Sequence, residues 1–520
     1  MSRGDDRIPS DTQPGQRAID GPALSSEILL DHPITCFMAT ASRDVRLHAA
    51  GMRWTTYGRT RLEGTGVRFP TRTILRALSR SVLGFALALV ISGVSHAESS
   101  PQEPTPQDPT PIEEPTPHAG REFRTKLFGE EIYVAPRDRR SVTAASFGLQ
   151  WIPDGPAQLE VLPFGALYVW RNWDDDNRRF RGTITGVVND LNYSIGLRDF
   201  PNWTLLFTLN NFIAPLGRSE NVEGQRIRDT EIEWSYIFAG FGLGYRLPIR
   251  PFRQDSAVNL FVTYEPGYRW FKGTGHTSPQ YGVPSDTYEG RIHFKARIDA
   301  MTRNLMELPH VGVTLGGDVI QGHRAKWTAW GGPPFDIPDF KQDRIYLAVS
   351  GYLMTASGLP FIDSEKHRLV SSFHAGIGKD LDRFTAFRLP GRPTGYEWDA
   401  VSLPMIHGVA FNELFPRHYA IANVQYRYEA LFFLYPYVEA GWAFVDRPRF
   451  TSDGRITQST DSMPTVGVGV VSGAPWRSQI ELNYTYNFGI FRDSDGGSPT
   501  RGGHGMFLFW SKELGSKTGG

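Results

Sequence analysis

Residues 479–488 read Gln-Ile-Glu-Leu-Asn-Tyr-Thr-Tyr-Asn-Phe, and apolar and polar side chains alternate through this stretch without a break. Ile480, Leu482, Tyr484, Tyr486 and Phe488 share one face, and every residue of the other face is polar. Because successive side chains of a strand point to opposite faces, this period of two predicts a β-strand. Its length suits a tilted membrane strand, which needs about 9–11 residues, better than a soluble strand of about 5–6.

The same alternation recurs from Ala144 onward, between clusters of Gly, Pro, Asn and Asp. No long helical periodicity interrupts it, and we count about sixteen strands. They are expected to begin near Ala144, Leu159, Phe180, Leu191, Trp203, Ile232, Val258, Gly290, Pro309, Arg344, Glu365, His418, Phe433, Pro464, Ser478 and Gly505. The fold class is therefore all-β.

The lengths of the connections separate a transmembrane antiparallel β-barrel from a soluble sandwich. Connections after even-numbered strands are mostly short, as at 201–202, 430–431 and 473–475. Those after odd-numbered strands are mostly long, at 214–231, 274–289, 321–343, 376–417, 446–463 and 491–504. Outer-membrane barrels have short periplasmic turns and long extracellular loops, so the pattern favours the barrel.

The first part of the chain is typical of a targeting segment. Arginines precede the short apolar run Val82–Ile91, and small residues at Ser95 and Ala97 suit a cleavage site, so 73–97 is predicted to be a signal peptide. Residues 1–72 are then an upstream, non-structural segment with a mis-assigned start. Residues 98–122 form a Pro-rich periplasmic linker, 123–514 the barrel and 515–520 a C-terminal tail.

Composition excludes several functions. The 520 residues hold 55 Lys and Arg against 55 Asp and Glu, so no basic surplus predicts a nucleic-acid partner. A single cysteine excludes a disulfide scaffold and Cys-based metal sites. No G-x-S-x-G or H-x-x-x-H pattern occurs, so we expect no enzyme, no cofactor and no metal, and a barrel phospholipase is the least favoured alternative.

The region from about Phe384 to Leu514 resembles the C-terminal barrel of the BamA/TamA superfamily, the bacterial surface antigen proteins. The family has a lumen-folded loop with an R-G-[FY] tip, then strands with E-x-R and F-x-D-x-G, then three closing strands. Here Gly395 and Tyr396 match the tip, and Thr394 stands where the family has arginine. Gln425–Tyr426–Arg427 and Tyr437–Val438–Glu439–Ala440–Gly441 stand at the two strand motifs.

The resemblance implies a long loop folded into the lumen before the last five strands. Arg392 is expected to replace the tip arginine, so the lumen lock would comprise Arg392, Gly395, Tyr396, Arg427, Glu439 and Gly441. An ordinary set of paired lumen charges is the alternative. The periplasmic polypeptide-transport-associated domains of the family have no counterpart in the short proline-rich segment before residue 142.

The expected function is that of an outer-membrane barrel of the BamA/TamA type in insertion, assembly or translocation of polypeptide or lipid. Its mechanism would use a seam between the first and last strands, near Phe147 and Trp151 and near Phe507 and Trp510, where a client strand pairs by β-augmentation. Expected partners are the lipid bilayer, unfolded outer-membrane polypeptides and lipoproteins. The alternative is a passive pore or structural surface-antigen barrel, with selectivity set by lumen charges.

Overall fold

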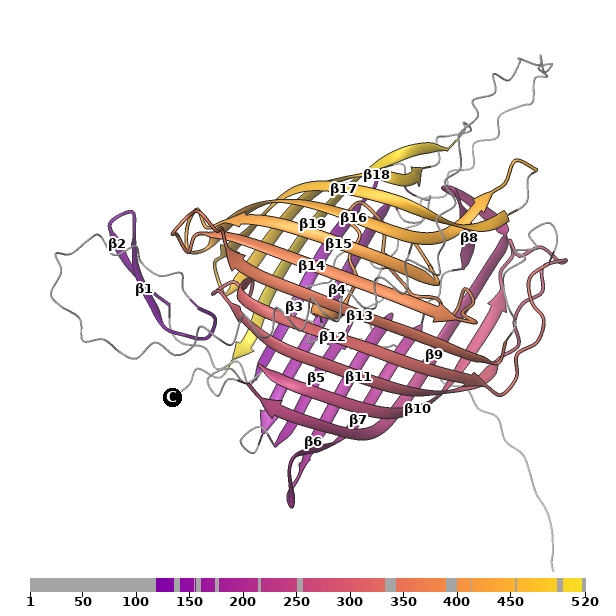
Figure 1. Cartoon of the computed structure of the whole chain (residues 1–520), viewed down its shortest axis with the longest axis horizontal. Coiled ribbons are helices and arrows are strands. Elements are labelled where there is room, and N and C mark those ends of the chain that lie inside the picture. Colours follow the sequence, from indigo (N-terminus) through magenta and orange to yellow (C-terminus); the bar gives the residue numbers. More distant parts are fainter. Residues whose placement is uncertain are drawn as a thin grey trace, which may run out of the picture. The chain divides into compact units, whose positions relative to one another are not determined.

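A computed structural model describes residues 118–134, 141–153, 155, 160–173, 177–213, 217–249, 256–332, 343–389, 400–411, 413–453, 456–492 and 499–516 (Figure 1). The segments predicted as upstream sequence and signal peptide, and nearly all of the predicted linker, lie outside these residues. No helix among the described residues is long and apolar enough to cross a membrane.

The described chain is built almost entirely of β-strands. In order they are β1 (Phe123–Leu127), β2 (Glu130–Val134), β3 (Val142–Trp151), β4 (Val161–Trp173), β5 (Arg178–Ile184), β6 (Val188–Leu197), β7 (Phe200–Ile213), β8 (Arg218–Val222), β9 (Gln225–Pro248), β10 (Ala257–Gly273), β11 (Thr287–Arg303), β12 (Pro309–Arg324), β13 (Ile345–Gly358), β14 (His367–Lys379), β15 (His418–Tyr428), β16 (Leu434–Phe450), β17 (Ile456–Ala474), β18 (Ser478–Arg492) and β19 (Thr500–Ser516).

Sixteen of these strands, β3 to β7 and β9 to β19, form a closed antiparallel barrel, which confirms the predicted fold class and strand number. Each strand pairs with its neighbours in the chain, and β19 pairs with β3 to close the ring. The short β8 pairs with the first part of β9 and extends that strand's hairpin, while β7 pairs directly with β9. Closure gives every strand of the ring a paired neighbour on each side, as a membrane span requires.

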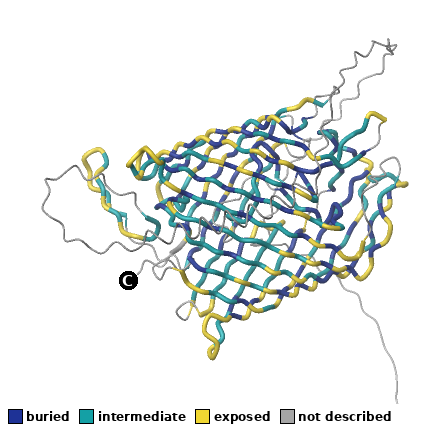
Figure 2. The backbone as a smooth tube through the Cα atoms, viewed as in Figure 1, coloured by how far each residue is buried: buried dark blue, intermediate teal, exposed yellow. Residues whose placement is uncertain are grey.

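Burial alternates along the barrel strands, so that buried residues stand between more exposed ones (Figure 2). On β18, Ile480, Leu482 and Tyr484 are exposed, whereas Glu481 and Asn483 are buried. The outer face is thus apolar and the inner face largely polar, the arrangement of a barrel that meets lipid outside and water or polar protein inside.

Two of the expected long loops are mostly strand. The predicted loop 446–463 is wrong, because β16 continues to Phe450 and β17 begins at Ile456. Arg447 and Arg449 of β16 form ion pairs with Asp461 of β17 at 2.5 and 3.0 Å, which stabilise this extension. The predicted loop 214–231 likewise contains β8 and the start of β9.

The segment before the barrel forms a hairpin of its own. β1 and β2 make a separate two-stranded sheet, and the closed sheet begins at Val142 and ends at Ser516. Just before the hairpin, His118 forms an isolated bridge with Asn304 at the turn between β11 and β12. The ring of Phe123 lies 5.5 Å from that of Phe432, in the turn between β15 and β16. The hairpin therefore stands at the short-turn end of the barrel.

Candidate functional site

Residues 380–417 connect β14 to β15, and we call them the lumen loop, because the part of this segment that the structure describes folds back inside the barrel. Their described residues are 380–389, 400–411 and 413–417, and they include the 3-10 turn η1 (Ala400–Ser402). Hydrogen bonds join this loop to inward-facing side chains from Arg324 of β12 around to Gln150 of β3. The described residues thus lie in the lumen, as the expected lumen-folded loop does.

The first contact of the lumen loop with the wall is made by Asp382. Its carboxylate accepts hydrogen bonds from the backbone N–H groups of Phe384 (2.9 Å) and Thr385 (3.1 Å), which hold a tight turn. The same carboxylate pairs with Arg324 of β12 at 2.6 Å, and both side chains are completely buried. Arg324 also contacts Glu289 of β11 at 3.3 Å. Removing one member of such a buried group costs about 3–5 kcal/mol, because a charge is left unpaired.

Arg383 and Phe384 extend this contact to the hairpin of β8 and β9. Arg383 pairs with Glu220 at 3.2 Å and donates to the carbonyl of Thr230 at 3.1 Å. The ring of Phe384 lies within an aromatic cluster, with ring centroids 4.7 to 6.2 Å away at Phe271, Trp330, Trp234 and Trp327. We call Asp382, Arg383 and Phe384 the charged anchor.

Arg388 lies further along the loop, against aromatic rings of the wall. Its guanidinium carbon is 4.3 Å from the ring centroid of Trp234, 4.6 Å from that of Phe212 and 5.2 Å from that of Tyr236. Burial lowers the pKa of Arg388, and Tyr236 opposes this shift. A cation held over several rings adds a further attachment of the loop to β7 and β9.

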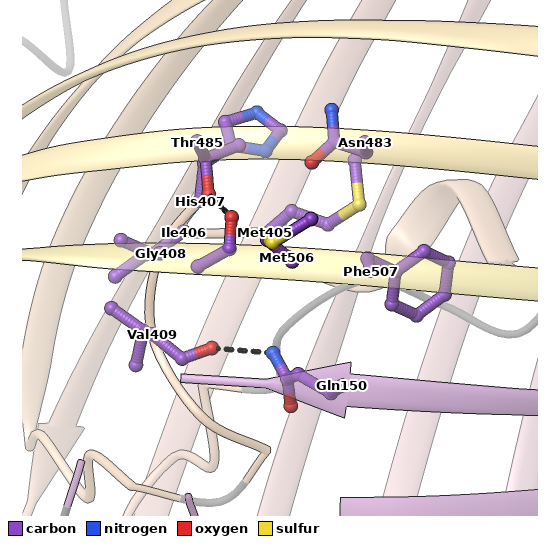
Figure 3. Close-up of a pocket in the computed structure, with 11 residues that line it drawn as sticks. Gln150, Met405, Ile406, His407, Gly408, Val409, Asn483, Thr485, Met506 and Phe507 are labelled. Atoms are coloured by element: carbon purple, nitrogen blue, oxygen red, sulfur yellow. Dashed lines mark hydrogen bonds between the residues drawn. The ribbon is translucent and has the colours of Figure 1, made fainter. Parts of the chain in front are cut away.

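The second contact is made by residues 405–411 and 413, where wall side chains from three strands hold backbone groups of the loop; Figure 3 shows the bond between Gln150 and Val409. Asn423 of β15 donates to the carbonyl of Met405 at 3.2 Å, and Asn487 of β18 to that of His407 at 3.0 Å. Gln150 of β3 donates to the carbonyl of Val409 at 2.9 Å and accepts from the N–H of Phe411 at 3.0 Å. One short segment is therefore bonded to strands on both sides of β19.

Arg492 of β18 holds this segment through Glu413 of the loop. Their side chains form a fully buried ion pair, and Arg492 also donates to the carbonyl of Gly408 at 2.8 Å. Gly408 has φ of 73°, and Gly505 of β19 packs so closely against it that a Cβ on Gly505 would lie 3.0 Å from the Gly408 Cα. Two glycines thus allow loop and wall backbones to touch. We call residues 405–411 and 413 the seam brace.

Glu439, one of the expected lock residues, lies under the seam brace. Its carboxylate is 3.2 Å from His407 Nδ1 of the loop and accepts hydrogen bonds from Asn483 at 2.8 Å and Gln425 at 3.3 Å. A loop residue therefore contacts Glu439 in the lumen, and among the described residues it is a histidine. Gly441 faces Asn423 and Thr465, where a Cβ would lie 2.3 Å from the Asn423 Oδ1.

The other expected lock residues are placed differently. Arg427 is buried and donates to the backbone carbonyl of Pro309, and it contacts no described residue of the lumen loop. Arg392, Gly395 and Tyr396 lie outside the described residues. The structure thus brings Glu439 to the loop and leaves Arg427 near the short-turn end of β12.

The four expected seam residues lie on the two strands that close the barrel. Phe147 of β3 stands opposite Trp510 of β19, and Trp151 stands opposite Met506. Phe147, Trp151 and Trp510 are exposed on the lipid face, whereas Phe507 is buried and lines the small cavity between β19 and the seam brace (Figure 3). The seam has ten residue pairs, with one bulge between Glu513 and Gly515.

Sequence reasoning missed the charged anchor and the role of Gln150. The motif Asp382–Arg383–Phe384–Thr385 carries a usable signal, since Asp followed three residues later by Thr favours a side-chain-capped turn. The sequence signal for Gln150 is weaker, because it consists only of a polar residue at an inward position next to the lipid-facing Trp151.

These features define the class. A closed ring of sixteen antiparallel strands with an apolar outer face and a polar, loop-filled interior is a transmembrane barrel of the bacterial outer membrane. Among the described residues, no group of three or more His, Cys, Asp or Glu side chains is arranged to hold a metal ion.

Comparison with known proteins gives structural neighbours only. No protein-family model and no curated protein matches the chain. Among solved structures it is similar to BamA from Haemophilus ducreyi lacking POTRA domains 1-3, with TM-score 0.40, 11% identity, and coverage of 75% of each chain. It is also similar to CdiB from Acinetobacter baumannii (TM-score 0.40, 11% identity, 76% of this chain and 66% of that one). CdiB from Escherichia coli gives TM-score 0.41 at 9% identity over 75% of this chain and 67% of that one.

Proposed function

We propose that this outer-membrane barrel serves the insertion, assembly or translocation of polypeptide or lipid by opening between β3 and β19. The observation that carries the proposal is the seam brace, which is bonded to Asn487 and Arg492 of β18 on one side of β19 and to Gln150 of β3 on the other. Separating β3 from β19 while the brace stays in place breaks both bonds of Gln150. The brace therefore acts as a latch, and its release frees the first strand.

An opened seam would offer two strand edges to a client. The backbone N–H and C=O groups of β3 and β19 that now pair with each other would pair with an extended client segment by β-augmentation. The outward aromatic residues Phe147, Trp151 and Trp510 would flank that segment in the membrane. No covalent step is needed, and the clients would be unfolded outer-membrane polypeptides, with lipoproteins as accessory partners.

A disulfide across the seam tests this mechanism. Ser146 and Ser511 stand directly opposite each other, and opposed residues of antiparallel strands have Cα atoms about 4.5–5.5 Å apart, as a disulfide requires. In a chain with Cys36→Ser, the pair Ser146→Cys and Ser511→Cys is oxidised in phosphatidylcholine vesicles. We expect the accelerated folding of an added unfolded barrel protein to be lost, and restored by dithiothreitol.

The matched control places the same bond inside the wall. Thr355 of β13 and Ser371 of β14 are also directly opposed, and their oxidised cysteine pair should leave client folding unchanged. Equal client folding with the seam oxidised and reduced would reject the mechanism.

The same variant addresses the passive-pore alternative. That alternative draws support from charges fixed on the lumen wall, where Arg291 pairs with Glu265 and Arg297 with Asp318, each at 2.7 Å. A steady, ion-selective conductance that is identical with the seam oxidised and reduced, together with no client folding, would establish the pore in place of the seam mechanism.

A further inference from the structure

A second stretch of wall, away from the seam, has an incomplete ladder of backbone hydrogen bonds between strands. β5 is the shortest of the sixteen barrel strands, with 7 residues, and it shares seven residue pairs with β4 and seven with β6. A strand that spans the hydrocarbon layer needs about 9–11 residues. β5 therefore ends well short of β4, which continues to Val161, whereas β6 begins at Val188, next to the last residue that pairs with β5.

The missing part of β5 leaves an edge of β4 unpaired. Pairing with β5 begins at Leu167, so Val161–Ala166 pairs with β3 alone among the described strands. The N–H of Ile152 donates to the carbonyl of Glu160 at 2.7 Å, and because bonded positions alternate, Val161, Pro163 and Gly165 direct their backbone groups toward the missing neighbour. Pro163 has no N–H, which removes one unpaired donor from this edge. We call Val161–Ala166 the unpaired β4 edge.

This edge lies at the depth of the lipid-facing residues. Leu167 and Ile184, opposite each other at the end of β5, are exposed on the outer face, and so are Val161 above them and Val187 in the next turn. The turn needs no water, because the Asn189 side-chain oxygen accepts hydrogen bonds from the N–H groups of Thr185 (3.1 Å) and Gly186 (3.2 Å). Lipid is therefore the medium that covers the edge from outside.

The lumen side of the edge is apolar as well. Phe164 stacks on Phe507 and Phe509 of β19, with ring centroids 5.5 and 6.3 Å apart. Its ring lies over Gly148 of β3, where a Cβ would come within 2.1 Å of the Phe164 ring. The opposite wall differs, since Glu265 and Arg291 are paired there. We call Phe164, Phe507 and Phe509 the aromatic patch.

We propose that the unpaired β4 edge is a lateral portal through which one acyl chain of a bilayer lipid passes between the membrane and the aromatic patch. The outer rim of the portal and its inner end are both apolar, so the chain exchanges one apolar environment for another while no backbone ladder has to break. The lipid headgroup stays outside, beside the turn that Asn189 holds, where the Asn189 amide also donates to the buried Asn211 at 3.0 Å. The portal works with the seam closed and is thus independent of the proposed seam opening.

Photo-crosslinking from inside the barrel tests the portal. The photoreactive residue p-benzoylphenylalanine replaces Phe164 in the full chain, in phosphatidylcholine vesicles whose acyl chains carry an alkyne tag. We expect a tagged lipid adduct. A probe at Phe207, which is exposed on the lipid face, is the positive control, and a probe at the buried Tyr352, which stacks on His374 in the lumen, should give none. Leu162, the next inward position on β4, serves as a second probe position if the Phe164 variant does not fold.

A charged side chain beside the unpaired β4 edge distinguishes the portal from other routes by which a lipid could reach Phe164. Val187→Asp places a carboxylate beside the edge, where charge on the lipid face of a barrel is unfavourable, and it should lower the adduct at Phe164 at least about fivefold. Val187→Leu should leave it unchanged. The portal is overturned if the probes at Phe164 and Leu162 give no more adduct than the probe at Tyr352, or if Val187→Asp leaves the adduct intact.

Discussion

The seam between β3 and β19 and the wall at β5 face the same bilayer with only β4 between them, yet they are held together differently. The seam has ten residue pairs and is tied from inside by Gln150 to the seam brace. β5 has seven pairs on each side, and the loop contacts that fix the charged anchor and the seam brace go to other strands. The interface that joins the two ends of the barrel is thus not the one with the fewest backbone pairs.

The difference indicates two kinds of opening. At the seam, the backbone hydrogen bonds between β3 and β19 and the bonds of Gln150 to the seam brace must all break. Such an opening separates two whole strands, and it makes room for a client strand. At β5, the ladder is already absent beside Val161–Ala166, so a small apolar molecule needs only side-chain movement. The variants below weaken one region and leave the other unchanged, in order of decreasing expected effect.

Glu413→Ala should have the largest effect. It leaves Arg492 buried without its carboxylate, and such a loss costs about 3 kcal/mol of unfolding free energy. The measurement is urea unfolding of the barrel in vesicles, followed by tryptophan fluorescence. Glu365→Ala is the control, because that side chain is half exposed and should change stability by less than about 1 kcal/mol. Equal losses in the two variants would show that the seam brace adds nothing to the closed barrel.

Gln150→Leu tests the latch alone. It leaves the carbonyl of Val409 and the N–H of Phe411 unsatisfied, at a cost of about 2 kcal/mol. In hydrogen exchange, the amides of β5 should exchange faster than those of β3 in the unaltered protein, and Gln150→Leu should bring β3 to the rate of β5. Gln458→Leu, in the extension of β17 above the wall, should leave both rates unchanged. A β3 rate that does not respond to Gln150→Leu would contradict the latch.

The sixteen strands were predictable because lipid on one side and polar groups on the other impose a period of two. The largest error in a strand start is at β17, which begins at Ile456 where Pro464 was expected. There both strand faces are polar, as at Thr457 and Gln458, so the period carries no signal. The long loop before the last five strands could also be predicted, from its length and from the family resemblance.

The contacts of the candidate site were far less predictable. Gln150 and Val409 are 259 positions apart in the chain, and their hydrogen bond depends on how the loop crosses the lumen. Likewise, a strand near Phe180 was expected, but the place where β5 stops depends on its register with Leu167 of β4. Periodicity finds strands, and it contains no information on where a ladder ends.

Pro163→Ala should have the smallest effect on the free energy of unfolding, and it changes only the wall at β5 and leaves the seam unaltered. The alanine adds an N–H to an edge that lacks a partner, which should cost about 1 kcal/mol in the urea measurement. Gly165→Ala is the matched control, because it adds a methyl group on the same edge with no new donor, and its Cβ would meet nothing closer than 3.6 Å. A stabilising Pro163→Ala would mean that the new N–H finds an acceptor, so that the β4 edge is covered by backbone. In that case the wall at β5 would be as continuous as the seam, and the contrast between the two regions would be lost.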